Sequence, residues 1–357
     1  MRIELKPRSV NSWQPLNENN LYRELQHEGI NFSIPNLIAL MKSDFVRSYD
    51  PFVQYFESLT EWDGKDHIDH FASFIHASDK ERFRCHFKKM LVRVVACALN
   101  PKVFNKQALI LVQCEQNSGK STLSRFLAPP ELSEYVAENI ATDKDSLISL
   151  CENFIIILDE LATMSKLEVN ALKSIFSKDK VKVRRPYERK AEMITRRASF
   201  IGSTNNLEFL NDETGSVRWL CFEIIKIDWN YSKEVVINKV WSQAYSLYQS
   251  GFKYELTTEE IIENDQINKK HQVNTSELEL IQQYLKPGSK EQHDEFWNAT
   301  QVMNYLTAKT ERAIPLKLIL VGKALAILGF SREQKWNGTY QIKGYYLSYL
   351  LTNSAHE

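Results

Sequence analysis

The feature that most constrains the fold of this chain is an apolar run that leads directly into a glycine-containing turn and then into a helix. Residues 108–112 read ALILV, with no charged side chain, and residues 121–128 read STLSRFLA, with apolar residues at helical spacing. The turn between them is QCEQNSGK (113–120). A strand, a turn and a helix in this order form half of a parallel βαβ unit, because parallel strands need a crossover connection.

Three further strand candidates follow the first one along the chain. They are FIIIL (154–158), ASFIGSTN (198–205) and RWLCFEI (218–224), and helical or polar segments separate them. Strands that alternate with helices predict a mostly parallel sheet and an α/β fold.

The flanking segments predict additional domains. Residues 1–104 contain the helical patterns FVQYFESL, IDHFASFIHA and ERFRCHFKKMLVRVVACAL, so we expect a mainly helical N-terminal domain. Residues 105–230 would form the sheet domain and residues 231–290 a polar helical extension. In residues 291–357, the helices FWNATQVMNYL and IPLKLILVGKALAILGF precede a hairpin that turns at Asn337 and Gly338. This order indicates a winged-helix-like domain, which could bind either DNA or protein.

Composition narrows the class of protein. Lys and Arg total 45, as do Asp and Glu, so any attraction for nucleic acid must come from a local patch. The five cysteines form no C-x-x-C pair, which argues against a zinc site or a disulfide framework. The start MRIELKPRSV lacks an apolar signal region, and no run has the ~18 apolar residues of a membrane span. We therefore expect a cytoplasmic protein without a membrane partner.

The turn at 113–120 resembles a phosphate-binding loop, G-x-x-x-x-G-K-[ST], although Cys114 replaces the first glycine. In such loops backbone N–H groups surround the phosphates, the lysine reaches the β and γ phosphates, and the hydroxyl binds Mg²⁺. Gly119, Lys120 and Ser121 occupy the three defining positions. The alternative is a polar strand-to-helix turn without a ligand. The predicted ATP-binding residues are Gln116, Asn117, Ser118, Gly119, Lys120, Ser121 and Thr122.

A carboxylate pair and an asparagine end the next strands. Asp159 and Glu160 follow FIIIL, at the strand end where doubly wound sheets bind ligands. Asp159 would join Ser121 in holding Mg²⁺, and Glu160 would orient the attacking water. The alternative is that both acids stabilise the start of the next helix. Asn205 could position the same water, or could belong to an ordinary turn.

Basic residues suggest two further roles. Arg218 follows a glycine turn and could stabilise transition-state charge on a neighbour's γ-phosphate, although a surface arginine is the alternative. Residues 178–197 contain nine Lys or Arg and three Asp or Glu, and VKV alternates like a half-exposed strand. A hairpin there could bind single-stranded DNA, or could simply be a solvated charged hairpin. The candidate DNA-binding residues are Lys182, Arg184, Arg185 and Tyr187, with Arg189 and Lys190 at the tip.

Taken together, the ordered motifs resemble a known family. EQNSGKST, FIIILDE, LKSIFSKDKVKVRRPYERK, FIGSTN and TGSVRW resemble the virulence-associated protein E (VirE-type) ATPases of phages and mobile elements, which are similar to superfamily 3 helicases of the AAA+ class. EWDGKDHIDHF (61–71) resembles the segment that precedes their ATPase core. The resemblance runs roughly from Tyr55 to Glu223. Within it, Val217 replaces the first arginine of the pair often seen after the TG turn.

The resemblance implies a fold, a site and an activity. The fold would be an AAA+ type P-loop ATPase core with an N-terminal helical domain and a C-terminal winged-helix-like domain. The family's site would comprise Lys120 and Ser121 of the phosphate loop, the acidic pair Asp159 and Glu160, the sensor Asn205 and the trans-acting arginine finger Arg218. The expected cofactors are ATP and Mg²⁺.

The implied activity is that of an ATP-dependent DNA helicase or translocase in phage or mobile-element replication. It would act on single-stranded or forked DNA as a homo-oligomeric, hexameric ring in the cytoplasm of a bacterial host, with a separate primase as a candidate partner. Two alternatives stay open. One is an ATP-dependent initiator or loader switch without strand separation, and the other is a non-enzymatic DNA-binding or inhibitory protein with a decayed nucleotide site.

Overall fold

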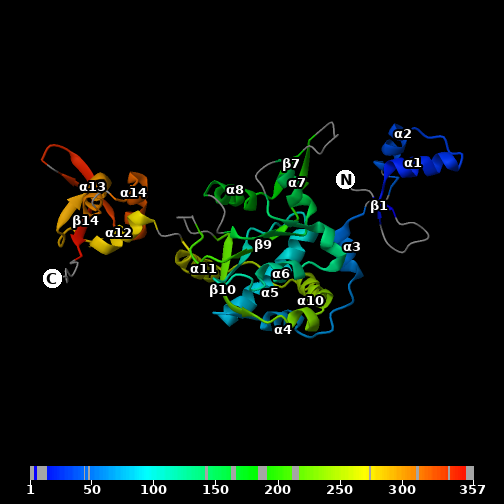
Figure 1. Cartoon of the computed structure of the whole chain (residues 1–357), viewed down its shortest axis with the longest axis horizontal. Helices are drawn as coiled ribbons and strands as arrows, with labels where there is room; N and C mark the ends of the chain where they lie inside the picture. The colour runs from blue at the N-terminus through cyan, green and yellow to red at the C-terminus, as the bar shows by residue number, and fades with distance from the viewer. Residues whose placement is uncertain are drawn as a thin grey trace. The chain divides into compact units, whose positions relative to one another are not determined.

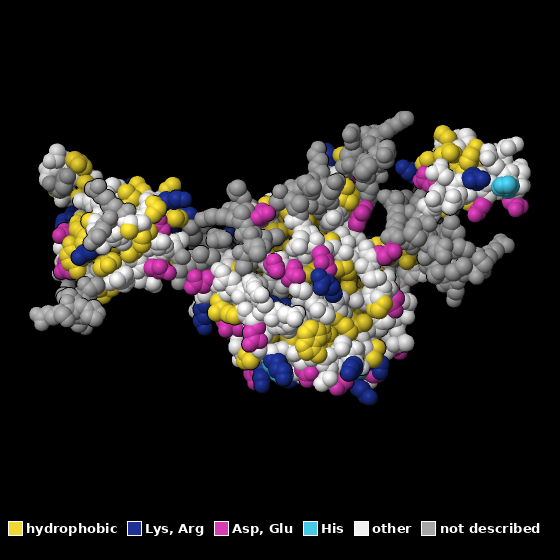
Figure 2. Space-filling model, in the orientation of Figure 1, with side chains coloured by type: hydrophobic (Ala, Val, Ile, Leu, Met, Phe, Trp, Pro, Cys, Tyr) yellow, Lys and Arg dark blue, Asp and Glu magenta, His cyan; other side chains and the backbone are white. Residues whose placement is uncertain are grey.

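The computed structural model describes residues 4–5, 14–43, 45–46, 49–140, 144–161, 166–183, 191–210, 217–272, 275–310, 313–336 and 338–350 (Figure 1). Residues outside these ranges are grey in Figure 2. The chain divides into two compact units, Met1–Glu57 and Ser58–Glu357. No helix in these ranges combines the length and the apolar composition needed to cross a membrane.

The first unit contains short elements. They are β1 (Glu4–Leu5) and β2 (Gln14–Pro15), which pair antiparallel, then α1 (Glu18–His27), α2 (Ile34–Met41) and most of α3 (Pro51–Ser58). Ser33 accepts a hydrogen bond from the backbone N–H of Asn36, and Pro35 lies in the first turn of α2, where its missing N–H costs nothing. These local signals explain why a helix begins there.

A six-stranded sheet forms the centre of the second unit. Its strands, in spatial order, are β3 (Ile75–Ala77), β10 (Trp219–Ile227), β4 (Ala108–Val112), β9 (Ser199–Thr204), β6 (Ile155–Leu158) and β5 (Val136–Glu138). Every neighbouring pair is parallel except β3 and β10. All residues of β4, β6 and β9 are buried, as expected for parallel strands covered on both faces. The predicted α/β fold with a mostly parallel sheet is confirmed.

Helices surround this sheet (Figure 1). They are α4 (His67–Ser73), α5 (Lys80–Leu99), α6 (Lys120–Phe126), η1 (Pro130–Tyr135), α7 (Lys144–Glu152), α8 (Lys166–Phe176), α9 (Tyr231–Glu234), α10 (Ile237–Gln249) and α11 (Thr258–Lys270). Ile110 of β4 shares a core cluster with Leu150 of α7 and Phe176 of α8. The cluster also contains Val181 of β7 (Lys180–Val183), which pairs antiparallel with β8 (Glu192–Thr195).

The C-terminal part contains α12 (Ser276–Tyr284), β11 (Leu285–Pro287), β12 (Glu295–Trp297), α13 (Ala299–Lys309), α14 (Leu318–Ile327), β13 (Arg332–Trp336) and β14 (Gln341–Tyr349). Strand β14 pairs antiparallel with β11, β12 and β13, and three helices pack through Ile281, Leu306 and Leu325 in a separate core.

Three local predictions were wrong. The helical pattern predicted at 68–77 ends at Ser73, and Ile75–Ala77 pairs with β10, because an available sheet edge overrides short-range periodicity. Phe296 and Trp297 belong to strand β12 instead of the following helix. Trp336 pairs with Gln341, so four residues connect β13 and β14 where a two-residue Asn-Gly turn was expected; Asn337 itself lies outside the described residues.

Candidate functional site

The loop 113–119 joins β4 to α6 at the carboxyl end of the central strand. Asn117 and Gly119 adopt the left-handed conformation, with φ of 55° and 90°. Asparagine and glycine tolerate this conformation better than other residues, so the local sequence suits the turn. Gly119 is also the N-cap of α6, and no side chain caps the helix there. Backbone N–H groups of the loop and the first helical turn are therefore directed to this edge of the sheet. Cys114 is an exposed free thiol in the same loop.

Lys120 is folded back beneath this loop. Its side chain is buried, and Nζ donates hydrogen bonds to Gln113 O at 3.1 Å, Glu115 O at 3.0 Å and Ser118 Oγ at 2.8 Å. Burial lowers the pKa of Lys120, while the negative charge of Asp159 opposes this shift. The ammonium thus lies at the centre of the loop. Its three hydrogen bonds are made to backbone and hydroxyl oxygens of the loop, and none of them is made to a side-chain carboxylate.

Asp159 follows β6 and contacts two hydroxyl groups. Its Oδ1 accepts hydrogen bonds from Ser121 Oγ at 2.8 Å and Ser203 Oγ at 2.5 Å. Burial raises the pKa of Asp159, but these two hydrogen bonds, the backbone N–H of Glu160 and the charge of Arg125 together hold the pKa below its ordinary value. The Asp159 backbone N–H donates to Asn139 Oδ1 at 3.2 Å. The carboxylate is therefore ionised at neutral pH and fixed beside the Ser121 hydroxyl.

The oxygen atoms of Ser121 and Asp159 fit a magnesium ion. Mg²⁺ in proteins keeps several waters and takes one or two protein oxygens together with substrate phosphates. Among the described residues, no group of three or more His, Cys, Asp or Glu side chains could hold a metal ion. A hydroxyl and one carboxylate thus suit a metal that arrives with a phosphate ligand better than they suit an all-protein metal cage.

Glu160 and Asn205 lie at the same edge of the sheet. Glu160 directly follows Asp159, is exposed, and has a φ of 52°, which is unusual for a residue with a side chain. Asn205 follows the last residue of β9 and is exposed. Because β4, β9 and β6 are adjacent and parallel, the positions after their last residues meet at one edge. Strained backbone at such an edge is a recurring property of functional sites.

Arg218 lies at the opposite edge. It precedes Trp219, and Trp219 pairs with Ala108, the first residue of β4, whereas the loop follows the last residue of β4. Arg218 Nη2 donates to Ser177 Oγ at 3.0 Å. The structure therefore brings Lys120, Ser121 and Asp159 together but leaves Arg218 of the same chain away from them.

The predicted basic hairpin is described only in part. Strands β7 and β8 pair antiparallel, and Lys182 is exposed on β7. The other candidate DNA-binding residues, Arg184, Arg185, Tyr187, Arg189 and Lys190, lie outside the described residues.

Two basic residues of the stretch 178–197, Arg196 and Arg197, form hydrogen bonds to backbone carbonyl groups inside the domain. Arg196 is fully buried, and it donates hydrogen bonds to the carbonyl oxygens of Phe176 at 2.9 Å and Ala198 at 3.1 Å. Arg197 Nε donates to Ala98 O at 2.7 Å. Burial lowers the pKa of Arg196 to about 10, so the guanidinium remains charged at neutral pH. Arg196 and Arg197, which were not among the candidate DNA-binding residues, therefore have a structural role in this domain.

We expect Arg196→Ala to lower the free energy of unfolding by about 3 kcal/mol or more, because several buried carbonyl groups lose a charged donor together. Urea unfolding of the full chain measures this change. Lys180→Ala, an exposed substitution on β7, is the matched control and should change it by less than about 0.5 kcal/mol. Equal midpoints for the two variants would contradict a structural role for Arg196.

Sequence reasoning missed Ser203 and Asn139, which both contact Asp159. Ser203 belongs to the motif that was noted for Asn205, and strand alternation places positions 203 and 205 on the same face, which is the signal that could have found it. Asn139 follows β5 and has a φ of 57°; only the pairing of β5 with β6 brings it to Asp159.

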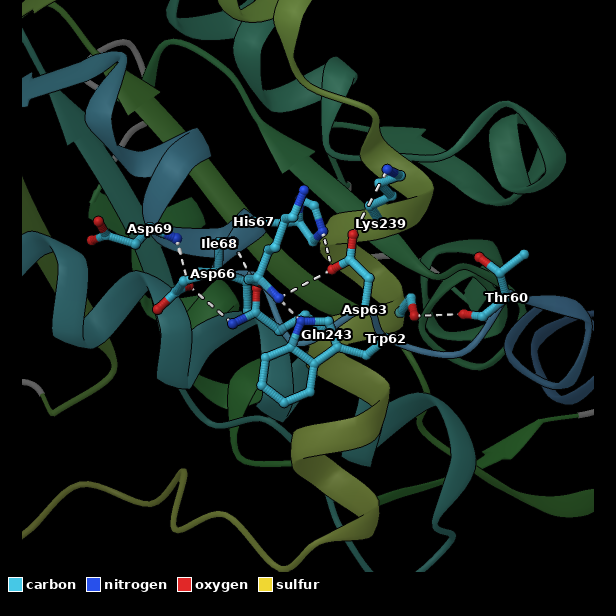
Figure 3. A network of polar contacts seen from close by, with 11 residues as sticks. Thr60, Trp62, Asp63, Asp66, His67, Ile68, Asp69, Lys239 and Gln243 are labelled. Carbon is cyan, nitrogen blue, oxygen red and sulfur yellow. Dashed lines mark hydrogen bonds and ion pairs between the residues drawn. The ribbon is translucent and has the colours of Figure 1, made fainter.

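The segment 61–71 forms a polar network that fastens α4 to α10 (Figure 3). Asp63 Oδ1 lies 2.7 Å from His67 Nε2, and Trp62 Nε1 donates to Lys65 O at 2.6 Å. Gln243 of α10 donates to Asp66 Oδ1 at 2.9 Å and accepts from the backbone N–H of Ile68 at 2.8 Å. These contacts give the segment a structural role, because they hold α4 and α10 together beside the sheet.

Comparisons with solved structures concern the fold of this chain. The apo structure of the NrS-1 C-terminal region has a TM-score of 0.51 and 14% sequence identity, over 97% of this chain and 94% of that one. At this identity the likeness concerns the fold. An A-form structure of the same region has a TM-score of 0.44 and 16% identity over 77% of this chain, and only 65% of that chain is covered. The X-ray structure of JCV helicase has a TM-score of 0.32 and 12% identity over 73% and 80% of the two chains, too low to indicate a shared fold.

Residues 56–273 match the virulence-associated protein E-like domain, which is more than half of the chain. The chain belongs to this family, and the resemblance inferred from its motifs is confirmed. A search of curated proteins finds no match to the sequence.

Proposed function

We propose that this protein is an ATP-dependent DNA helicase or translocase of the superfamily 3 type. The observation that carries the proposal is the convergence of Lys120, Ser121 and Asp159 at the carboxyl edge of a parallel sheet. A loop with left-handed turns, a buried ammonium and a hydroxyl–carboxylate pair suit a nucleoside triphosphate with its metal. A polar turn without a ligand would not need a lysine buried beneath it.

Each side chain then has a role in hydrolysis. Backbone N–H groups of residues 116–122 would hold the phosphates, and Lys120 would leave its carbonyl partners for the β and γ phosphates. Mg²⁺, held by Ser121 and Asp159, would neutralise phosphate charge. Glu160 would orient the attacking water and accept its proton, and Asn205 would help to position that water.

A ring would complete this site. Arg218 lies at the sheet edge opposite the loop, so the same subunit does not supply it to its own nucleotide. A head-to-tail neighbour could do so, and closed rings satisfy such interfaces for every subunit. We therefore propose a homo-oligomeric ring of six subunits with Arg218 as its finger in trans. The charge developing on the γ-phosphate would be stabilised only after assembly.

DNA would contact the β7–β8 hairpin, whose connection carries most of the basic candidates. Lysine and arginine would neutralise phosphates of one strand, and Tyr187 would stack on a base. The same proposal includes the domain boundaries at residues 104, 230 and 290. The last domain would be winged-helix-like, formed around α13, α14 and the β13–β14 pair. The setting of phage or mobile-element replication in a bacterial host, with a primase as partner, rests on the family resemblance.

ATP hydrolysis with and without single-stranded DNA tests the proposal. We expect DNA-stimulated turnover that is lost in Glu160→Gln, since that change keeps the shape of the side chain but removes the base. Absence of turnover in an assembled wild-type sample would contradict it. Strand displacement on forked DNA then separates a helicase from a loader switch, which would hydrolyse ATP without releasing a strand.

The hairpin makes a separate prediction. Replacing Arg189 and Lys190 together by alanine should weaken single-strand binding at fixed salt and reduce the slope of log K against log salt by about 1.4, for two lost phosphate contacts. Basal ATP hydrolysis should persist. The matched control is Lys80→Ala with Lys102→Ala, two exposed lysines away from the hairpin. If affinity and salt slope match the wild type, the hairpin does not bind DNA.

A further inference from the structure

Trp229 lies against the glycine of the loop. It follows β10, and its side chain remains 51% exposed. A Cβ atom at Gly119 would come within 2.8 Å of Trp229 Cζ2 and 2.9 Å of Cη2. The benzene edge of the indole therefore rests on the loop backbone, and only a glycine leaves room for it. The motifs of the sequence assign no role to this tryptophan, and the hydrolysis chemistry above does not use it.

The backbone and a neighbouring ring hold Trp229 in place. The N–H of Asp228 donates to Phe74 O at 2.8 Å, and Ser232 Oγ donates to Trp229 O at 2.9 Å. The ring of Tyr231 is nearly parallel to the indole, at 23° with centroids 6.4 Å apart. Tyr231 is itself buried and packs edge-on against Phe126 of α6, with ring centroids 4.9 Å apart. One side of the indole is thus supported from the core of the domain.

Trp229 is more exposed than two other tryptophans of the same domain. Trp219 and Trp241, which pack in the core, are 1% and 0% exposed. Trp229 instead leaves about half of its surface exposed beside the loop, where a bound ligand could cover it. If the loop binds the phosphates of a nucleotide, the ribose connects them to the base. The base is a flat ring system with apolar faces. Aromatic side chains bind such faces by stacking, whichever base is present.

We propose that Trp229 is the platform on which the base of the bound nucleoside triphosphate stacks. This inference rests on the proposed function, because the loop must hold the phosphates for the base to reach the indole. It adds a base-binding residue, from a segment beyond the last parallel strand, to a site otherwise made of phosphate, metal and water contacts.

The test compares two ligands by titration calorimetry on the full chain: ATP, and inorganic tripolyphosphate, which has the phosphates but no base. Trp229→Ala should weaken ATP binding by about tenfold or more, as loss of one base–aromatic stack does, and leave tripolyphosphate binding unchanged. Trp229→Phe should recover most of the ATP affinity. Trp336→Ala removes another exposed tryptophan, on β13, and is the matched control with no expected effect.

Other outcomes overturn the proposal in distinct ways. Unchanged ATP affinity in Trp229→Ala, or an equal loss for both ligands, would exclude a base platform. Tighter ATP binding would mean that the indole covers the loop instead. A wild-type chain that binds neither ligand would overturn the phosphate loop, and the platform with it. Thermal unfolding of each variant shows whether a loss of ATP affinity is caused by misfolding. Trp229→Phe is the mild substitution in this comparison.

Discussion

Replacing Lys120 with alanine is expected to lower ATP turnover by at least about 10²-fold, because in the proposed site this ammonium would be the positive charge nearest the transferred phosphate. The ammonium is buried and bonded to Gln113 O, Glu115 O and Ser118 Oγ, so it is already placed at the loop before a nucleotide arrives. A donor held in position stabilises charge without the cost of reorganising at the moment of reaction. The measurement is steady-state phosphate release at saturating ATP.

Lys102→Ala is the matched control for this substitution. Lys102 is exposed in a turn after α5 and has no place in the proposed site, so its loss should leave turnover unchanged. Comparing the melting temperatures of both variants tests whether Lys120→Ala still folds. Retained hydrolysis by a folded, contaminant-free Lys120→Ala sample would remove the phosphate-loop assignment.

Replacing Arg218 with alanine should lower turnover by about 10³-fold or more while nucleotide binding persists, because an arginine finger acts on transition-state charge. The geometry explains why binding should be spared. Arg218 precedes β10, whereas the loop follows the opposite end of the adjacent β4. The readouts are phosphate release and a separate titration with ATP. Arg332→Ala, an exposed arginine on β13, is the control that should change neither.

Mixing two inactive variants tests whether Arg218 acts in trans. An Arg218→Ala subunit keeps its own Glu160, and a Glu160→Gln neighbour can supply the missing arginine. A mixture should therefore regain part of the turnover that both pure samples lack. If a mixture that assembles remains inactive at all ratios, Arg218 does not act across a subunit interface.

Much of the site could be predicted from short stretches of sequence. The buried strand ALILV and the SGKST turn were enough to place Lys120 and Ser121 after β4, and FIIIL placed Asp159 after β6. Parallel strands separated by helices end at one edge, so the hydroxyl and the carboxylate could be expected to meet, as they do at 2.8 Å. Long helices with clear caps, such as α5 after Asp79, were equally predictable.

Hydrophobic periodicity and turn residues act over a few positions, so they specify the parallel sheet, the loop and the charged groups that follow its strands. The folded structure alone shows which residues meet across long separations. It placed Arg218 at the far edge from the loop, buried Arg196 among carbonyl groups and laid Trp229 on Gly119. The physical reason is that spatial strand order differs from chain order: β10, the last of the parallel strands, lies beside β4, the first of those that carry the site. Local sequence patterns do not specify which strands become neighbours, so contacts between distant segments are known only from the folded structure.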